Sequence, residues 1–156
     1  MNPFTPFGLA AIAGAVTLAA WTPAFASAPS DLRRPLNVDA ALVSFDFVDL
    51  GQPGVTAGDS FVQADTLSVD GRPVGSDLFH CVAAGDETAA GLCDAVLVLG
   101  DATITAAGRI PNFEPADGQP FRFAITGGTN RYRRAAGEII VTETATGYTA
   151  IVDVQI

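Results

Sequence analysis

Short runs of hydrophobic and β-branched residues, separated by Gly, Pro and Asp, make up the chain beyond its N-terminal segment. No such run repeats its hydrophobic residues with the 3.6-residue period of a helix. The run at 41–49 instead alternates, with Val43, Phe45 and Phe47 on one face. Asp70-Gly71 separates two of the runs, and an Asp-Gly pair in that position is a strong signal for a hairpin turn. The pattern therefore predicts β-strands joined mainly by tight turns.

Eight strands are predicted, and their connections are mostly of hairpin length. They span residues 41–49, 61–69, 74–84, 92–99, 102–108, 121–126, 137–144 and 148–155. Several of them are apolar on both faces, which is typical of strands whose outer face contacts a partner or another subunit. An up-and-down barrel leaves no strand with an open edge. We therefore predict an all-β, eight-stranded antiparallel up-and-down β-barrel, whose interior is either filled by side chains or holds one small ligand.

The N-terminal segment has a different pattern. Phe7–Trp21 is an uncharged, mostly apolar run, and Ala24-Phe25-Ala26 follows it as a small-x-small site. A run of this kind before such a site is the signature of a secretory signal peptide. It is shorter than the ~20 residues that span a bilayer as a helix, which argues against an uncleaved anchor. We expect residues 1–26 to be a signal peptide, 27–37 a flexible leader and 38–156 the barrel domain of a secreted protein without a stable membrane anchor after cleavage.

Charge and composition narrow the range of functions. The chain has 17 acidic and 8 basic residues and a net charge of −9, which argues against nucleic acid as a partner because phosphate binding needs a basic face. A hydrophobic fraction of 49% with a charged fraction of 16% excludes a disordered chain. The single His and the absence of CxxC or HxxxH pairs argue against a bound metal. The sequence contains no GxSxG motif, so it gives no indication of a nucleophilic hydrolase.

Two cysteines lie on consecutive predicted strands that are joined by a short loop. Opposite positions on paired strands are ~4.5–5.5 Å apart at Cα, a separation that a disulfide can bridge. In a secreted protein, a disulfide between Cys81 and Cys93 is favoured over two free buried thiols or a reactive thiol.

Four Gly-containing motifs follow one another along the chain. They are Val48-Asp49-Leu50-Gly51, Gly58-Asp59-Ser60-Phe61, Asp70-Gly71-Arg72-Pro73-Val74-Gly75 and Gly127-Gly128-Thr129-Asn130-Arg131-Tyr132 with the Gly137-Glu138 that follows it. Their order resembles the allene oxide cyclase barrel-like family, the superfamily that also contains the dirigent proteins. Arg131 and Ala136 depart from the dirigent pattern, which typically has an acidic residue and Arg at these positions.

The resemblance implies a barrel that shapes a small molecule in its lumen. Allene oxide cyclases close a ring from a reactive epoxide, dirigent proteins steer the coupling of phenolics, and related bacterial barrels fold a polyketide chain for cycloaddition. None of these reactions needs a metal or a cofactor, so we expect neither here. The plant members assemble as oligomers, and a homo-oligomer is therefore an open expectation for this chain.

Four polar side chains are candidate catalytic groups: Asp49, His80, Tyr132 and Tyr148. Histidine exchanges protons near neutral pH, so His80 is either an acid–base group facing the barrel or an imidazole on its surface. Asp49 is either an inward-facing acid or a solvated carboxylate at a strand end. The two phenols can hydrogen-bond a ligand oxygen, although Tyr132 alternatively fills the turn that follows Gly128.

Three further residues are candidate ligand contacts. Phe45 and Phe47 supply apolar surface on the first predicted strand. Arg131 either pairs with the many carboxylates of the chain or belongs to an anion-binding rim at a barrel mouth. The sequence thus favours a cofactor-free cyclase or isomerase acting on a hydrophobic small molecule in the lumen. The alternatives are a non-catalytic carrier of a hydrophobic metabolite and a structural barrel with a filled interior.

Overall fold

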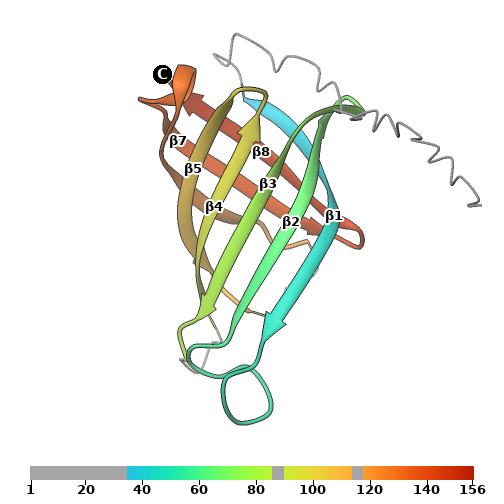
Figure 1. Cartoon of the computed structure of the whole chain (residues 1–156), viewed down its shortest axis with the longest axis vertical. Helices are drawn as coiled ribbons and strands as arrows, with labels where there is room; N and C mark the ends of the chain where they lie inside the picture. The colour runs from blue at the N-terminus through green and yellow to red at the C-terminus, as the bar shows by residue number, and fades with distance from the viewer. Residues whose placement is uncertain (1–34, 86–89, 114–117) are drawn as a thin grey trace, which may run out of the picture.

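Eight antiparallel strands, each hydrogen-bonded to the next along the chain, close into one barrel when β8 pairs with β1 (Figure 1). The structure is a computed structural model that describes residues 35–85, 90–113 and 118–156. The strands are β1 (Leu36–Val48), β2 (Ser60–Val69), β3 (Arg72–Ala83), β4 (Gly91–Leu99), β5 (Ala102–Ile110), β6 (Phe121–Gly128), β7 (Ala136–Thr144) and β8 (Gly147–Gln155). The predicted fold class is confirmed. The predicted signal peptide and most of the predicted leader lie outside the described residues.

The first strand starts earlier than the sequence pattern predicts. β1 begins at Leu36 instead of residue 41, and Leu36 pairs with Val152 while Asn37 pairs with Ile151. These partners lie at the far end of the chain. The extra residues become a strand because β8 needs them to close the barrel, and a local pattern does not contain that information.

One half of the barrel interior is packed solid. At the end that carries the β2–β3 and β4–β5 turns, the inward side chains Leu67, Leu99 and Ile104 are at most 1% exposed. The short 3₁₀ helix η1 (Asn130–Tyr132) covers this end, and its Tyr132 is 1% exposed. Each large apolar side chain buried in this way contributes about 1.5–3 kcal/mol to folding. This half of the barrel is part of the hydrophobic core.

The other half is left open by a bulge and an early end to the pairing. A register shift between Leu42 and Ser44 of β1 changes the parity, so that Phe45 faces inward on the same side as Leu42. The pairing of β8 with β1 ends at Gly147 opposite Ala41. Beyond that point β1 pairs only with β2 among the described residues, and Figure 1 shows β1 to β3 extending past the β7–β8 hairpin.

Cys81 and Cys93 are opposite each other on β3 and β4 and form a disulfide, with 4.1 Å between their Cα atoms. The predicted pairing is therefore confirmed. A disulfide is compatible with export to an oxidising compartment. Within the described ranges, no helix is both long and apolar enough to cross a membrane.

The outer face of the barrel exposes several apolar side chains. Leu78, Leu92, Val96 and Val98 are all more than a third exposed on β3 and β4. The two-faced apolar character expected from the sequence is present on these strands. A homo-oligomer stays a prediction.

Candidate functional site

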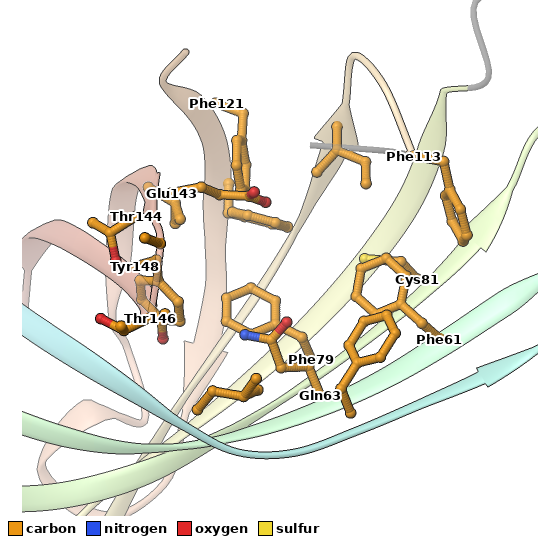
Figure 2. A pocket seen from close by; sticks show the side chains of 17 residues that line it. Phe61, Gln63, Phe79, Cys81, Phe113, Phe121, Glu143, Thr144, Thr146 and Tyr148 are labelled. Carbon is orange, nitrogen blue, oxygen red and sulfur yellow. The ribbon is translucent and has the colours of Figure 1, made fainter. Parts of the chain in front are cut away.

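A cavity of about 240 Å³ occupies the open half of the barrel (Figure 2). It is mostly apolar and is lined by side chains of β1, β2, β3, β5, β6, β7 and β8 and by the β7–β8 hairpin. Its lining consists of Leu42, Phe45, Phe61, Gln63, Phe79, Cys81, Ile110, Phe113, Phe121, Phe123, Val141, Glu143, Thr144, Ala145, Thr146, Gly147 and Tyr148. An engineered cavity of about 150 Å³ holds benzene, so this one has room for a larger ring system.

An inner aromatic cluster lines the deep part of the cavity. Phe79 lies at its centre, with its ring 5.5 Å from that of Phe123 and 5.4 Å from that of Tyr148, measured between centroids. Phe121 contacts Phe123 edge to face. These tilted and perpendicular arrangements are the preferred geometries of aromatic pairs. They hold the rings in fixed orientations around the cavity.

A second aromatic cluster lies at the mouth. Phe61 is central to it, with ring centroids 5.3 Å from Phe45 and 5.1 Å from Phe113. Phe47 contacts Phe113 edge to face at 6.2 Å, although Phe47 itself does not line the cavity. Phe45 and Phe47 are each about half exposed, which places them at the rim.

Two buried aspartates lie immediately below the cavity. Asp65 on β2 and Asp77 on β3 are direct cross-strand partners and are 1% and 4% exposed. The Tyr148 hydroxyl donates a hydrogen bond to Oδ2 of Asp77, and the Gln63 side-chain amide donates to Oδ2 of Asp65 at 2.9 Å. Both donors line the cavity. Each aspartate is therefore connected to the cavity through one side chain.

Burial controls the protonation of this pair. Burial raises the pKa of Asp77 from 3.8 to about 7; the nearby charge of Asp65 acts in the same direction, and the Tyr148 hydrogen bond opposes both. Burial also raises the pKa of Asp65, and burial next to Asp77 raises the pKa of the Tyr148 phenol. Oδ1 of each aspartate is buried without a hydrogen-bond partner among the described residues. One proton held by Asp77 at neutral pH relieves the repulsion between two adjacent carboxylates.

Asp59, a third buried aspartate, has a structural role away from the cavity. Its carboxylate accepts hydrogen bonds from the backbone N–H groups of Leu50 and Thr56, at 2.7 and 2.6 Å, and from the Thr56 hydroxyl. The two backbone hydrogen bonds lower the pKa of Asp59. Asp59 thus holds the β1–β2 loop in place as a hydrogen-bond acceptor, and it has no part in the polar pair below the cavity.

The structure brings two of the sequence-predicted residues to the cavity. Tyr148 is buried in the deep part of the cavity, and Phe45 lies at its rim. Phe47 lies next to the cavity, where its ring contacts the lining residue Phe113. Asp49 is exposed just after β1, in the loop that leads to β2. His80 is exposed on the outer face of β3, opposite Asp94. Neither Asp49 nor His80 lines the cavity.

The remaining two predicted residues lie at the packed end of the barrel. The Tyr132 ring is buried there, and the Arg131 guanidinium lies 5.0 Å from its centroid. Arg131 also donates to the carbonyl oxygen of Leu99 at 3.0 Å. Gly128 permits this arrangement, because a Cβ at that position would collide with the backbone of Thr103 and with Tyr132. This end contains the Gly-rich motif and is remote from the cavity lining.

Sequence reasoning missed Gln63, Asp65, Asp77 and Glu143. A signal was present in the parity of β2, because Phe61, Gln63, Asp65 and Leu67 alternate along one face. An Asp on the same face as Phe and Leu is a buried carboxylate that requires a partner. Identifying that partner required the β2–β3 register.

Comparison with known proteins places this geometry among related barrels. The family described as "Allene oxide cyclase barrel like domain" matches residues 37–156. No curated protein gives a significant match. The solved structure of a pyocyanin demethylase is 29% identical with a TM-score of 0.70, covering 78% of this chain and 100% of its own.

Two more distant structures share the fold. The exo-specific intermolecular Diels-Alderase AbnU is 15% identical with a TM-score of 0.63, over 78% of this chain and 96% of its own. The Diels Alderase AbmU from Streptomyces koyangensis is 18% identical with a TM-score of 0.60, over 76% of this chain and 61% of its own.

Proposed function

Since the chain belongs to the allene oxide cyclase barrel-like family, we propose that it is a cofactor-independent enzyme that isomerises or cyclises a hydrophobic, aromatic small molecule inside the barrel. One observation carries this proposal. Tyr148 lines the apolar cavity and donates its hydroxyl hydrogen bond to the buried Asp77, whose pKa is raised to about 7. A carboxyl group that titrates near the working pH is suited to both taking up and releasing a proton.

The chemistry follows from the order of the groups. In the fraction of the protein in which Asp77 is ionised, its carboxylate takes up the Tyr148 proton as the phenol oxygen accepts a proton from a ligand atom in the cavity, so that no free phenolate forms. The reverse movement returns a proton to another atom of the same ligand. The net reaction is an isomerisation, in which no proton or electron is gained or lost. Tyr148 is the catalytic residue of this scheme, and Asp77 acts through it.

The cavity supplies the rest of the rate enhancement. Fixed aromatic walls orient a flat ligand, and an apolar enclosure removes the water that competes for hydrogen bonds to the phenol. The similarity to a pyocyanin demethylase and to two Diels-Alderases supports small-molecule chemistry in barrels of this shape. Pyocyanin is accordingly the first compound to incubate with the protein, followed by linear precursors of bicyclic and tricyclic aromatics.

The test is turnover in the presence of a chelator, followed by mass spectrometry. Tyr148→Phe and Asp77→Asn should each lower kcat about 10²–10⁴-fold, which is the usual contribution of a proton-transfer group. Tyr132→Phe removes the other buried phenol, at the packed end, and should keep turnover. Full turnover in both Tyr148→Phe and Asp77→Asn would disprove the relay. Tight binding without any turnover would favour the carrier instead.

We also propose that the protein is secreted after cleavage following Ala26. The Cys81–Cys93 disulfide supports an oxidising destination. Mass spectrometry of the protein recovered from the culture medium tests this directly. A mature N-terminus at Ser27 is expected, and recovery of only the uncleaved chain in the cells would refute it.

A further inference from the structure

Two polar side chains that line the cavity use hydrogen-bond donors on the buried aspartates below it. The Tyr148 hydroxyl has a single hydrogen and donates it to Asp77. The Gln63 amide has two N–H hydrogens and donates one of them to Asp65, at 2.9 Å. Toward the cavity these two groups therefore retain two acceptor oxygens and only one donor, the second N–H of Gln63.

Asp65 determines which way the Gln63 amide is turned. Asp65 is 1% exposed, and because Asp77 holds the proton of the pair, the Asp65 carboxylate has no hydrogen to donate. Only the amide nitrogen can face it, since an amide oxygen in the same place would bring two acceptors into contact. Oε1 of Gln63 is thus directed away from Asp65, and no described residue donates a hydrogen bond to it.

Gln63 stands between the two aromatic clusters. On β2 it is paired with Phe79 of the inner cluster and with Phe45 of the cluster at the mouth. Figure 2 shows its amide group among the aromatic side chains of the lining. A ligand that fills the cavity displaces water from this amide. Its oxygen then stays unpaired unless the ligand supplies a donor, and an unpaired acceptor away from water is unfavourable.

Building on the proposed function, we infer that Gln63 determines the specificity of the cavity: its amide oxygen, fixed in direction by Asp65, accepts a hydrogen bond from an O–H or N–H group of the ligand. The ligand accordingly carries such a donor on an otherwise apolar skeleton. This contact is separate from the one at Tyr148, whose oxygen takes a proton during the reaction. Because Gln63 lies on β2 and Tyr148 on β8, the two contacts together fix the orientation of the ligand.

The test compares three uncharged two-ring probes of similar shape. 2-Naphthol donates and accepts hydrogen bonds, 2-methoxynaphthalene only accepts them, and 2-methylnaphthalene does neither. Binding to the full-length protein is followed by fluorescence titration at pH 6. The ratio of two affinities in a variant is compared with the same ratio in the wild type, so that differences in the hydration of the free probes cancel.

Gln63→Leu removes the amide and keeps a side chain of similar size. It should weaken binding of 2-naphthol about tenfold, the usual effect of removing a hydrogen-bond partner from a buried site. The affinity for 2-methylnaphthalene should stay the same or increase, which also shows that the cavity is intact. Gln155→Leu is the matched control, because it makes the same substitution at an exposed position on β8. It should leave all three affinities unchanged.

Asp65→Asn tests the fixed direction of the amide without removing it. An Asn at this position can donate to Oε1 of Gln63 as well as accept from its nitrogen, so the Gln63 amide can turn and present its NH₂ group to the cavity. The affinity for 2-methoxynaphthalene relative to 2-naphthol should then rise about threefold or more. This variant keeps the inference testable even if Gln63→Leu does not fold.

The outcomes distinguish this inference from the proposed function. An unchanged ratio of 2-naphthol to 2-methylnaphthalene affinity in Gln63→Leu, or an equal change in Gln155→Leu, would overturn it. Failure of 2-naphthol to bind to the wild type would also overturn it, and an unchanged ratio in Asp65→Asn would overturn the part assigned to Asp65. None of these results affects the Tyr148–Asp77 relay, which is judged by turnover. Full turnover in Tyr148→Phe would in turn disprove the relay and leave the binding contact at Gln63 standing.

Discussion

Replacing Asp77 by Asn should flatten the pH dependence of the barrel's stability. In the folded protein Asp77 keeps its proton up to about pH 7, whereas the same carboxyl in the unfolded chain releases it near 3.8. Folding therefore takes up a proton between these two pH values, and stability falls as the pH rises through this window. The stabilisation is fully present below pH 3.8 and is lost as the pH passes about 7.

The two pKa values set the magnitude. Their difference corresponds to about 4 kcal/mol at 1.36 kcal/mol per pH unit. About 3 kcal/mol of this is lost between pH 5 and pH 8, since part of the unfolded-state titration lies below pH 5. Burial raises the pKa of Asp65 too, which acts in the same direction and leaves a smaller residual slope in the variant.

Asn is a close substitute for the protonated carboxyl. Its amide oxygen can still accept from Tyr148, and its NH₂ group can donate to Asp65, but it carries no charge at any pH. The assay is urea unfolding at pH 5, 6, 7 and 8, with Asp153→Asn on the exposed face of β8 as the control. The wild type and Asp153→Asn should lose stability across this range, and Asp77→Asn should lose much less. A wild-type curve that is flat or rises with pH would refute a buried neutral Asp77.

Three further predictions concern the frame around the cavity. Reduction of the Cys81–Cys93 disulfide should lower the free energy of unfolding by about 3 kcal/mol, because the bond removes the entropy that the unfolded chain gains when a loop of this length opens. Denaturation with and without reductant measures this difference, and an unchanged midpoint would contradict it. Asp59→Ala should speed hydrogen exchange in the β1–β2 loop while the β4–β5 amides stay protected, and uniform protection would contradict its role as the loop's acceptor. Gly147→Ala should lower the melting temperature of the barrel more than Ala145→Gly does. Gly147 has a φ of +151°, and a Cβ added there would collide with the Ala40 carbonyl of β1.

The sequence pattern was sufficient for the barrel because each strand carries its own alternation and its own turn. The β2–β3 connection is predicted from Asp70-Gly71, and the structure has a tight turn there. Cys81 and Cys93 could be paired because their strands are consecutive. In each case the interacting residues are neighbours along the chain, so local rules apply.

The site could be predicted only in part, because it is assembled from distant strands. Tyr148 and Asp77 are far apart in sequence, and only barrel closure brings the end of the chain against its middle. The bulge in β1 reverses the parity midway, so alternation alone does not say which residues near Phe45 face inward. His80 was attractive for its chemistry, yet its position on β3 is one residue out of phase with Phe79 and directs it outward.

The Gly-rich motif and the candidate site lie in opposite halves of the barrel, and this separation has a physical reason. The motif around Gly128 and Tyr132 closes the packed half, where backbone proximity and a buried phenol leave little freedom for substitution. The open half has no such requirement, since its inward positions need only remain apolar or find a polar partner. Exposed lining residues such as Thr144 and Thr146 can therefore change the cavity's chemistry at small cost to the fold. The resemblance carried by this Gly-rich motif consequently predicts the barrel well, while the reaction must be derived from the few polar side chains that face the cavity.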